Sequence, residues 1–66
     1  MNAAKYTPPL EADVAQWADG LDNDARMHFE ERSAIREFDG GLSRRDAERA
    51  AMEETILWLH QRGTPR

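Results

Sequence analysis

Two histidines and two glutamates are the residues of this chain with the greatest potential to bind a metal ion. His28 and Glu31 are one helical turn apart, and Glu54 and His60 lie further along the chain. Helical metal centres of this kind normally carry a histidine and carboxylate pair on each of two helices, whereas His-x-x-Glu occurs once here. We therefore expect no metal and no other cofactor. We expect Glu31 and Glu54, each within an apolar stripe, to pair with arginines.

Serine chemistry is equally poorly supported. Ser33 falls inside an expected helix, Ser43 is placed to cap one, and neither has a histidine at helical spacing. The Gly40-Gly41 pair lacks the downstream Gly-Lys of a phosphate-binding loop. A chain of this size also has little room for a pocket that excludes water. We expect no catalytic residue and no enzymatic activity.

Length and composition limit the architecture. The chain has 66 residues and no cysteine, so it forms at most one domain and has neither disulfides nor thiolate metal sites. No run approaches the roughly 18 apolar residues of a membrane span, and the first six residues lack the apolar centre of a signal peptide. We expect a cytoplasmic protein that makes no contact with a membrane.

The apolar periodicity predicts an all-α fold, a small three-helix domain. The prolines Pro8 and Pro9 suit the first turn of the first helix. The helices should span about 9–19, 25–38 and 44–62, with frayed ends at 1–7 and 63–66.

Local signals mark the turns between these helices. Asp22-Asn23-Asp24 offers three candidate caps for the second helix. Gly40 and Gly41 can adopt positive φ and end that helix, and Ser43 can accept a hydrogen bond from the N-H groups that open the third. A connection this short predicts a helical hairpin at the centre of the domain.

The second helix presents two sets of apolar residues. At about 100° per residue, one arc contains Met27, Ala34, Ile35 and Phe38, and Phe29 points nearly the opposite way. The first arc is the expected core face. Phe29 is then either exposed or part of a second contact surface, and it is the leading candidate anchor for a partner, with Trp17 and Trp58 as further ones.

The third helix also has two apolar faces. One contains Ala47, Ala50, Ala51, Leu57 and Trp58, and the other contains Met52, Ile56 and Leu59. Two such faces suit a helix packed against both others. The second face also suits the seam of a homodimer, since a small domain gains stability from further burial. A dimeric structural module is therefore one alternative function.

The first third of the chain is acidic. From residue 6 to residue 25 it has no lysine or arginine, and the net charge of the whole chain is −4. An acidic surface repels nucleic acid and attracts basic protein surfaces, although the same charges also keep a small protein in solution. The candidate partner-binding acids are Glu11, Asp13, Asp19, Asp22 and Asp24.

A cluster of arginines around the glycine turn supports nucleic-acid binding as another alternative. Asp46 and Glu48 interrupt the cluster, and no separate recognition helix follows the turn. Several arginines also stand four residues from a glutamate, as on a solvated helix face. The candidate patch comprises Arg32, Arg36, Arg44, Arg45 and Arg49.

Residues 31–54, ERSAIREFDGGLSRRDAERAAMEE, resemble a short segment of small or terminal regions of plasmid and prophage proteins, some of them linked to replication. The resemblance covers more than a third of the chain. It implies a bacterial mobile-element protein, a group whose small acidic interaction proteins include inhibitors of host defence such as anti-CRISPR proteins. With the charge pattern, it predicts a non-enzymatic inhibitor or regulator that binds a basic surface of a protein complex.

Overall fold

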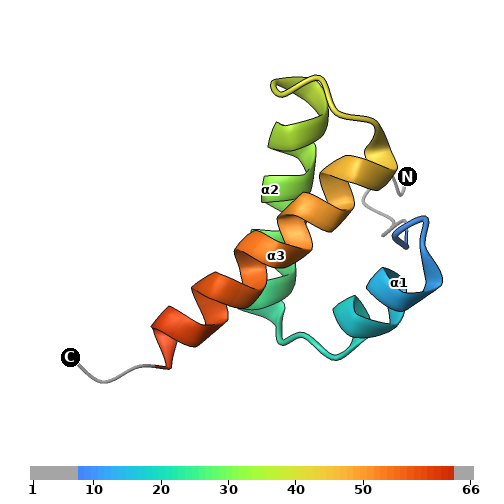
Figure 1. The fold of residues 1–66 in the computed structure, drawn as a ribbon. Helices are drawn as coiled ribbons and strands as arrows, with labels where there is room; N and C mark the ends of the chain where they lie inside the picture. Colours follow the sequence, from blue (N-terminus) through green and yellow to red (C-terminus); the bar gives the residue numbers. More distant parts are fainter. Residues whose placement is uncertain (1–7, 64–66) are drawn as a thin grey trace, which may run out of the picture.

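The computed structural model describes residues 8–63, which form three helices and no strand. The helices are α1 (Ala12–Asp19), α2 (Asn23–Phe38) and α3 (Arg44–Arg62). In Figure 1, α2 and α3 cross one another, α1 lies to one side, and the end of α3 extends away from α1. The expected all-α class with three helices is confirmed. The predicted frayed ends lie outside the described residues, apart from Gly63.

The helix α1 begins three residues later than predicted. Its first helical residue is Ala12, after Glu11 in an extended conformation. Pro8 and Pro9 precede the helix, and Pro9 is buried. The backbone N-H of Leu10 is donated to the Glu48 side chain at 2.9 Å and is not used to open the helix. The prolines thus belong to a segment that is bound to α3.

The turns follow their local signals. The Asp22 side chain accepts a hydrogen bond from the Ala25 N-H at 2.8 Å and caps α2. The Ser43 hydroxyl accepts one from the Asp46 N-H at 3.2 Å and caps α3. Gly41 has φ of 73°, and the Leu42 N-H after it is donated to the Arg36 carbonyl at 3.2 Å. The predicted glycine turn thus closes the end of α2 through its left-handed residue.

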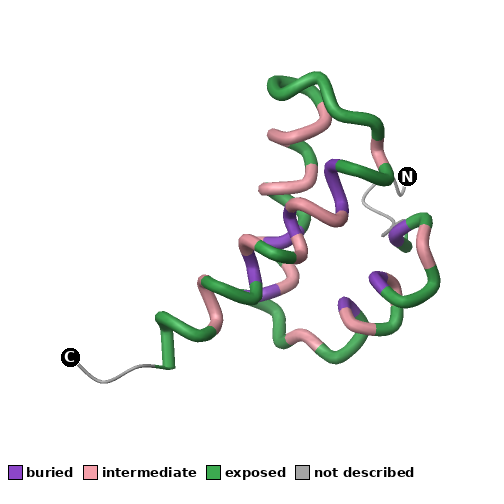
Figure 2. The backbone as a smooth tube through the Cα atoms, in the orientation of Figure 1, coloured by how far each residue is buried: buried purple, intermediate pink, exposed green. Residues whose placement is uncertain are grey.

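The core is small and lies where α3 faces α1 and the first half of α2 (Figure 2). Phe29 from α2 is 2% exposed, and its ring meets that of Trp17 edge-on, with the centroids 5.3 Å apart. Alanines make up much of the rest, which lets the helices approach closely. The buried hydrophobic residues are Val14, Ala18, Ala25, Phe29, Ala47 and Ala51.

The buried face of α2 is the opposite of the predicted one. Met27 is 67% exposed and Phe38 is 78% exposed, Ala34 is exposed, and Ile35 is only half-buried. The prediction that Phe29 is an exposed anchor is therefore wrong. The ring of Phe29 completes the contact with α1, and the larger set of apolar residues on α2 points outward.

Helix α3 buries a narrower stripe than expected. Ala47, Ala51 and Thr55 are fully buried, and Met52 packs on the edge of the core. Leu57 is 57% exposed, so the predicted core face loses one of its two largest members. No helix of residues 8–63 is long and apolar enough to cross a lipid bilayer.

Thr55 provides a test of this packing. Its side chain is fully buried, and its hydroxyl has no hydrogen-bond partner among the described residues. Thr55→Val removes the unpaired hydroxyl and keeps the branched shape, so the free energy of unfolding should rise by about 1 kcal/mol in urea denaturation. Thr55→Ser keeps the hydroxyl and removes a methyl group, and it should lower that free energy by a similar amount. A loss of stability in the valine variant would contradict this packing.

Candidate functional site

All three arginines of α2 point toward the other helices. Arg32 Nε is 2.9 Å from one oxygen of Glu54, and Arg36 is bound to the other oxygen. Arg26 donates to the carbonyls that end α1, Ala18 at 3.3 Å and Asp19 at 3.4 Å. Hydrogen bonds from Arg32, and then from Arg36, hold the pKa of Glu54 below its usual range. The expected pairing of Glu54 with arginine is confirmed, and it joins α2 to α3.

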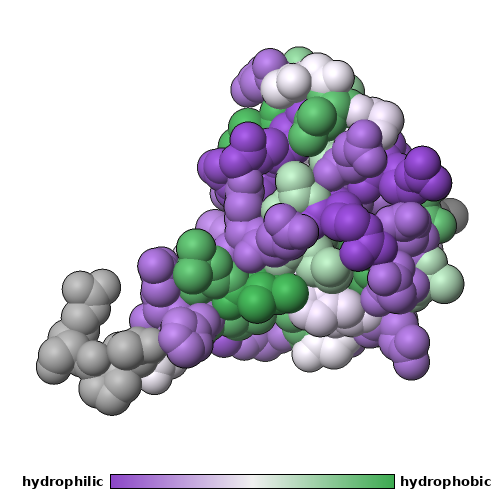
Figure 3. Space-filling model, viewed as in Figure 1, coloured by the Kyte–Doolittle hydropathy of each residue, from purple (hydrophilic) through white to green (hydrophobic). Residues whose placement is uncertain are grey.

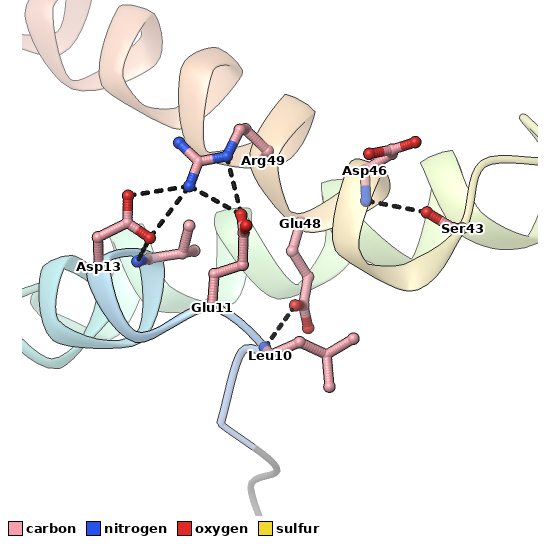
Figure 4. A network of polar contacts seen from close by, with 8 residues as sticks. Leu10, Glu11, Asp13, Ser43, Asp46, Glu48 and Arg49 are labelled. Atoms are coloured by element: carbon pink, nitrogen blue, oxygen red, sulfur yellow. Dashed lines mark hydrogen bonds and ion pairs between the residues drawn. The ribbon is translucent and has the colours of Figure 1, made fainter.

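Two acids at the start of α1, Glu11 just before the helix and Asp13 in its first turn, are held by Arg49 of α3 (Figure 4). One guanidinium nitrogen of Arg49 lies 2.8 Å from Glu11 and 2.9 Å from Asp13. The hydrogen bond from Arg49 to the Asp13 carboxylate is the main reason why the pKa of Asp13 is lowered. The same two carboxylates raise the pKa of Arg49. Glu11 and Asp13 therefore fasten α1 to α3.

Glu48 carries a second link between the N-terminal segment and α3. Glu48 as a whole is 7% exposed. Its carboxylate accepts a hydrogen bond from the Leu10 N-H and pairs with Arg44 Nε at 2.9 Å. Arg44 in turn donates to the Pro8 carbonyl at 2.8 Å. In the sequence, Glu48 interrupts the arginine cluster and stands four residues after Arg44, and the structure shows that pair. Its local signal was the four-residue spacing from Arg44, but its partner at Leu10 is 38 positions away.

Asp22 serves two structural purposes. It caps α2, and its carboxylate lies 3.0 Å from a guanidinium nitrogen of Arg62 near the end of α3. The hydrogen bond from the Ala25 N-H, followed by that from Arg62, lowers the pKa of Asp22. Of the five predicted partner-binding acids, Glu11, Asp13 and Asp22 are therefore part of the fold. Asp19 and Asp24 are exposed, and their carboxylates are in no ion pair within residues 8–63.

The predicted arginine patch does not form a free basic surface. Its members pair with carboxylates of the chain itself, except for Arg45, which is exposed and outside every ion pair of the described residues. Because these guanidinium groups are paired with carboxylates of the same chain, little positive charge is left to bind phosphate groups of a nucleic acid. The four paired members are Arg32, Arg36, Arg44 and Arg49.

The predicted dimer seam is only partly accessible. Met52 packs against the core, Leu59 is half-buried, and Ile56 is 47% exposed. Hydrophobic surface is visible in Figure 3 over the C-terminal half of α3, the part that carries Ile56 and Leu59. The dimer seam therefore stays a prediction, and Ile56 is its most exposed side chain.

The outward side of α2 brings together features that the sequence did not combine. Met27, Ala34 and Phe38 fall within an arc of about 40° on this helix and are all exposed. Met27 and Phe38 stand about 16 Å apart along it. Four carboxylates flank this arc, and none is in an ion pair within residues 8–63. They are Asp24, Glu30, Glu31 and Glu37, and with the apolar arc they form what we call the outer face of α2.

A groove lies at one end of the outer face, between α2 and α3. Its volume is about 400 Å³, and it is lined by Asp24, Met27, His28, Glu31 and Trp58. The His28 and Trp58 rings are stacked with centroids 4.5 Å apart and planes 10° apart. Glu31 lines this groove and is exposed, and the expected pairing with an arginine is not seen within residues 8–63.

Neither of the two tryptophans predicted as anchors is exposed. Trp17 is half-buried against the core, and Trp58 is half-buried beside His28. The Arg62 guanidinium carbon lies 4.9 Å from the centre of the Trp58 ring. The exposed large side chains of the outer face are instead Met27 and Phe38.

Within residues 8–63, no group of three or more histidine, cysteine, aspartate or glutamate side chains is placed to hold a metal ion. No protein-family model, curated protein or solved structure matches this chain. The function must therefore be inferred from the side chains themselves.

Proposed function

We propose that this protein is a non-enzymatic interaction module whose outer face of α2 binds a basic, partly apolar surface of a protein complex. The observation that carries the proposal is the direction of the α2 arginines. Because they point toward α1 and α3, the outer face carries apolar side chains and carboxylates without a compensating cation.

Each part of this face has a distinct role in binding. Met27 and Phe38 are the anchors, since large exposed apolar side chains release the most water when a partner covers them. The flanking carboxylates steer a basic partner and increase the rate of association more than the final affinity. Asp19, exposed at the end of α1, adds to this field. The outer face replaces the acids of α1 as the proposed binding surface.

Charge also favours a protein partner over nucleic acid. Residues 8–63 contain 13 acidic residues and seven arginines, and five of those arginines are in ion pairs within the chain. The resemblance to plasmid and prophage segments supports an inhibitor or regulator as the biological class. Such a protein would act by occupying a basic surface that another molecule needs.

The test is a capture experiment from bacterial lysate with the tagged protein, in nuclease-treated and untreated halves. The Met27→Ser and Phe38→Ser double variant should lose a specific basic partner, with a dissociation constant at least about thirty-fold higher for the purified pair. The matched control is Leu10→Ser with Leu57→Ser, which removes two exposed apolar side chains outside the outer face and the predicted seam.

The two lysate halves separate the alternatives. Capture of the same basic protein in both halves, retained by the control and lost by the outer-face variant, supports the proposal. Capture only without nuclease would overturn it in favour of nucleic-acid binding. A partner that binds both double variants equally would show that another surface is used.

A further inference from the structure

We infer that the groove between α2 and α3 receives an arginine side chain of the partner. This inference rests on the proposed function and makes it more specific, because the groove forms one end of the outer face of α2. Its lining contains two carboxylates, a thioether and two aromatic rings, and it contains no arginine or lysine.

The carboxylates supply the charge that a guanidinium group requires. Asp24 and Glu31 stand seven residues apart on α2 and so lie on the same side of the helix, two turns apart. Both are exposed and outside every ion pair of residues 8–63. Carboxylates between the helices already hold arginines of the chain, as Glu54 of α3 holds Arg32 and Arg36 of α2. Asp24 and Glu31 thus remain available to an external cation.

The rest of the lining suits the shape of arginine. A guanidinium group is planar, stacks on aromatic rings and binds carboxylates through two hydrogen bonds. The His28 and Trp58 rings are stacked on one another, and the Arg62 guanidinium lies over the Trp58 ring at 4.9 Å, so the ring face that stays open to such a group is the outer face of His28. Met27 gives an apolar contact for the methylene stem. An ammonium group would use the charges of the groove, but it has no planar face to stack on His28.

The test uses the full chain, labelled with ¹⁵N, and titrates it with Nα-acetylarginine methylamide while NMR spectra are recorded. The indole N-H of Trp58 and the amides of Asp24 and Glu31 should shift with saturation, and the indole N-H of Trp17 should not. The citrulline analogue, which has nearly the same shape but no charge, should produce shifts at least about ten times weaker.

Variants locate the site. Asp24→Asn with Glu31→Gln should weaken binding of the arginine probe about ten-fold. Glu30→Gln with Glu37→Gln removes the same charge from the opposite flank of α2, and it should change the dissociation constant of the arginine probe less than two-fold. Equal weakening by both pairs would overturn the inference, because it would indicate general attraction to an acidic helix. Equal binding of the citrulline or lysine analogue would overturn the choice of arginine.

These titrations contain no partner, so the two proposals can fail separately. The proposed function alone would be overturned if the groove binds arginine with saturation but the partner still binds the variant with Met27 and Phe38 replaced. The inference alone would be overturned if those substitutions abolish partner binding but arginine causes no chemical-shift change at the groove.

Discussion

Replacing Phe29 by alanine should remove much of the folding stability of this protein. The ring is 2% exposed and makes the edge-on contact with Trp17 that joins α2 to α1. Loss of a buried phenylalanine costs about 3–5 kcal/mol, and a domain of this length has a total stability of only about 3–10 kcal/mol. The measurement is urea denaturation followed by far-ultraviolet circular dichroism.

Phe38 provides the matched control for this experiment. It is the other phenylalanine of α2 and is 78% exposed, so Phe38→Ala should change the free energy of unfolding by no more than about 0.5 kcal/mol. Phe29→Leu keeps much of the buried volume and should show an intermediate loss, which covers the case of an unfolded alanine variant. The reverse order, with Phe38 the more costly to replace, would mean that α2 packs through the face predicted from its periodicity.

Glu48→Ala should lower the free energy of unfolding by about 2 kcal/mol. The substitution removes a buried carboxylate, and it leaves the Leu10 N-H without its acceptor and Arg44 without its ionic partner. Hydrogen exchange at the Leu10 amide should become faster, because Glu48 holds that segment against α3.

Glu53→Ala is the control for Glu48. Glu53 is exposed on the same helix, is outside every ion pair of residues 8–63, and its replacement makes the same change in charge and helix propensity. Its effect should stay within about 0.5 kcal/mol. If both alanine variants lose the same stability, the contact between Glu48 and the N-terminal segment contributes nothing.

The location of the outer face explains why sequence periodicity misled at α2. Both sides of this helix offer apolar residues, and the side with more of them is the exposed one. Arg32 and Arg36 lie on the same inward side of α2 as Phe29. Both arginines pair with Glu54, which lies 22 residues from Arg32 and 18 from Arg36. A periodicity count has no access to such a partner.

The candidate binding residues show the same limit. The acids between residues 11 and 24 form one group by composition, yet the structure divides them. Glu11 and Asp13 pair with Arg49, whereas the carboxylates of Asp19 and Asp24 are in no ion pair within residues 8–63. Charge counting identified an acidic surface but could not tell which carboxylates the chain uses internally, because those pairings join residues 36 to 40 positions apart.

The sequence by itself determined the all-α class, the three helices and the turns between them. These depend on interactions within a few residues, such as the caps at Asp22 and Ser43 and the left-handed Gly41. Only the tertiary structure decided which face of α2 is buried, which charges are paired and where an exposed apolar face meets free carboxylates. The physical reason is that burial and ion pairing depend on distant helices, whereas capping and helix propensity are local.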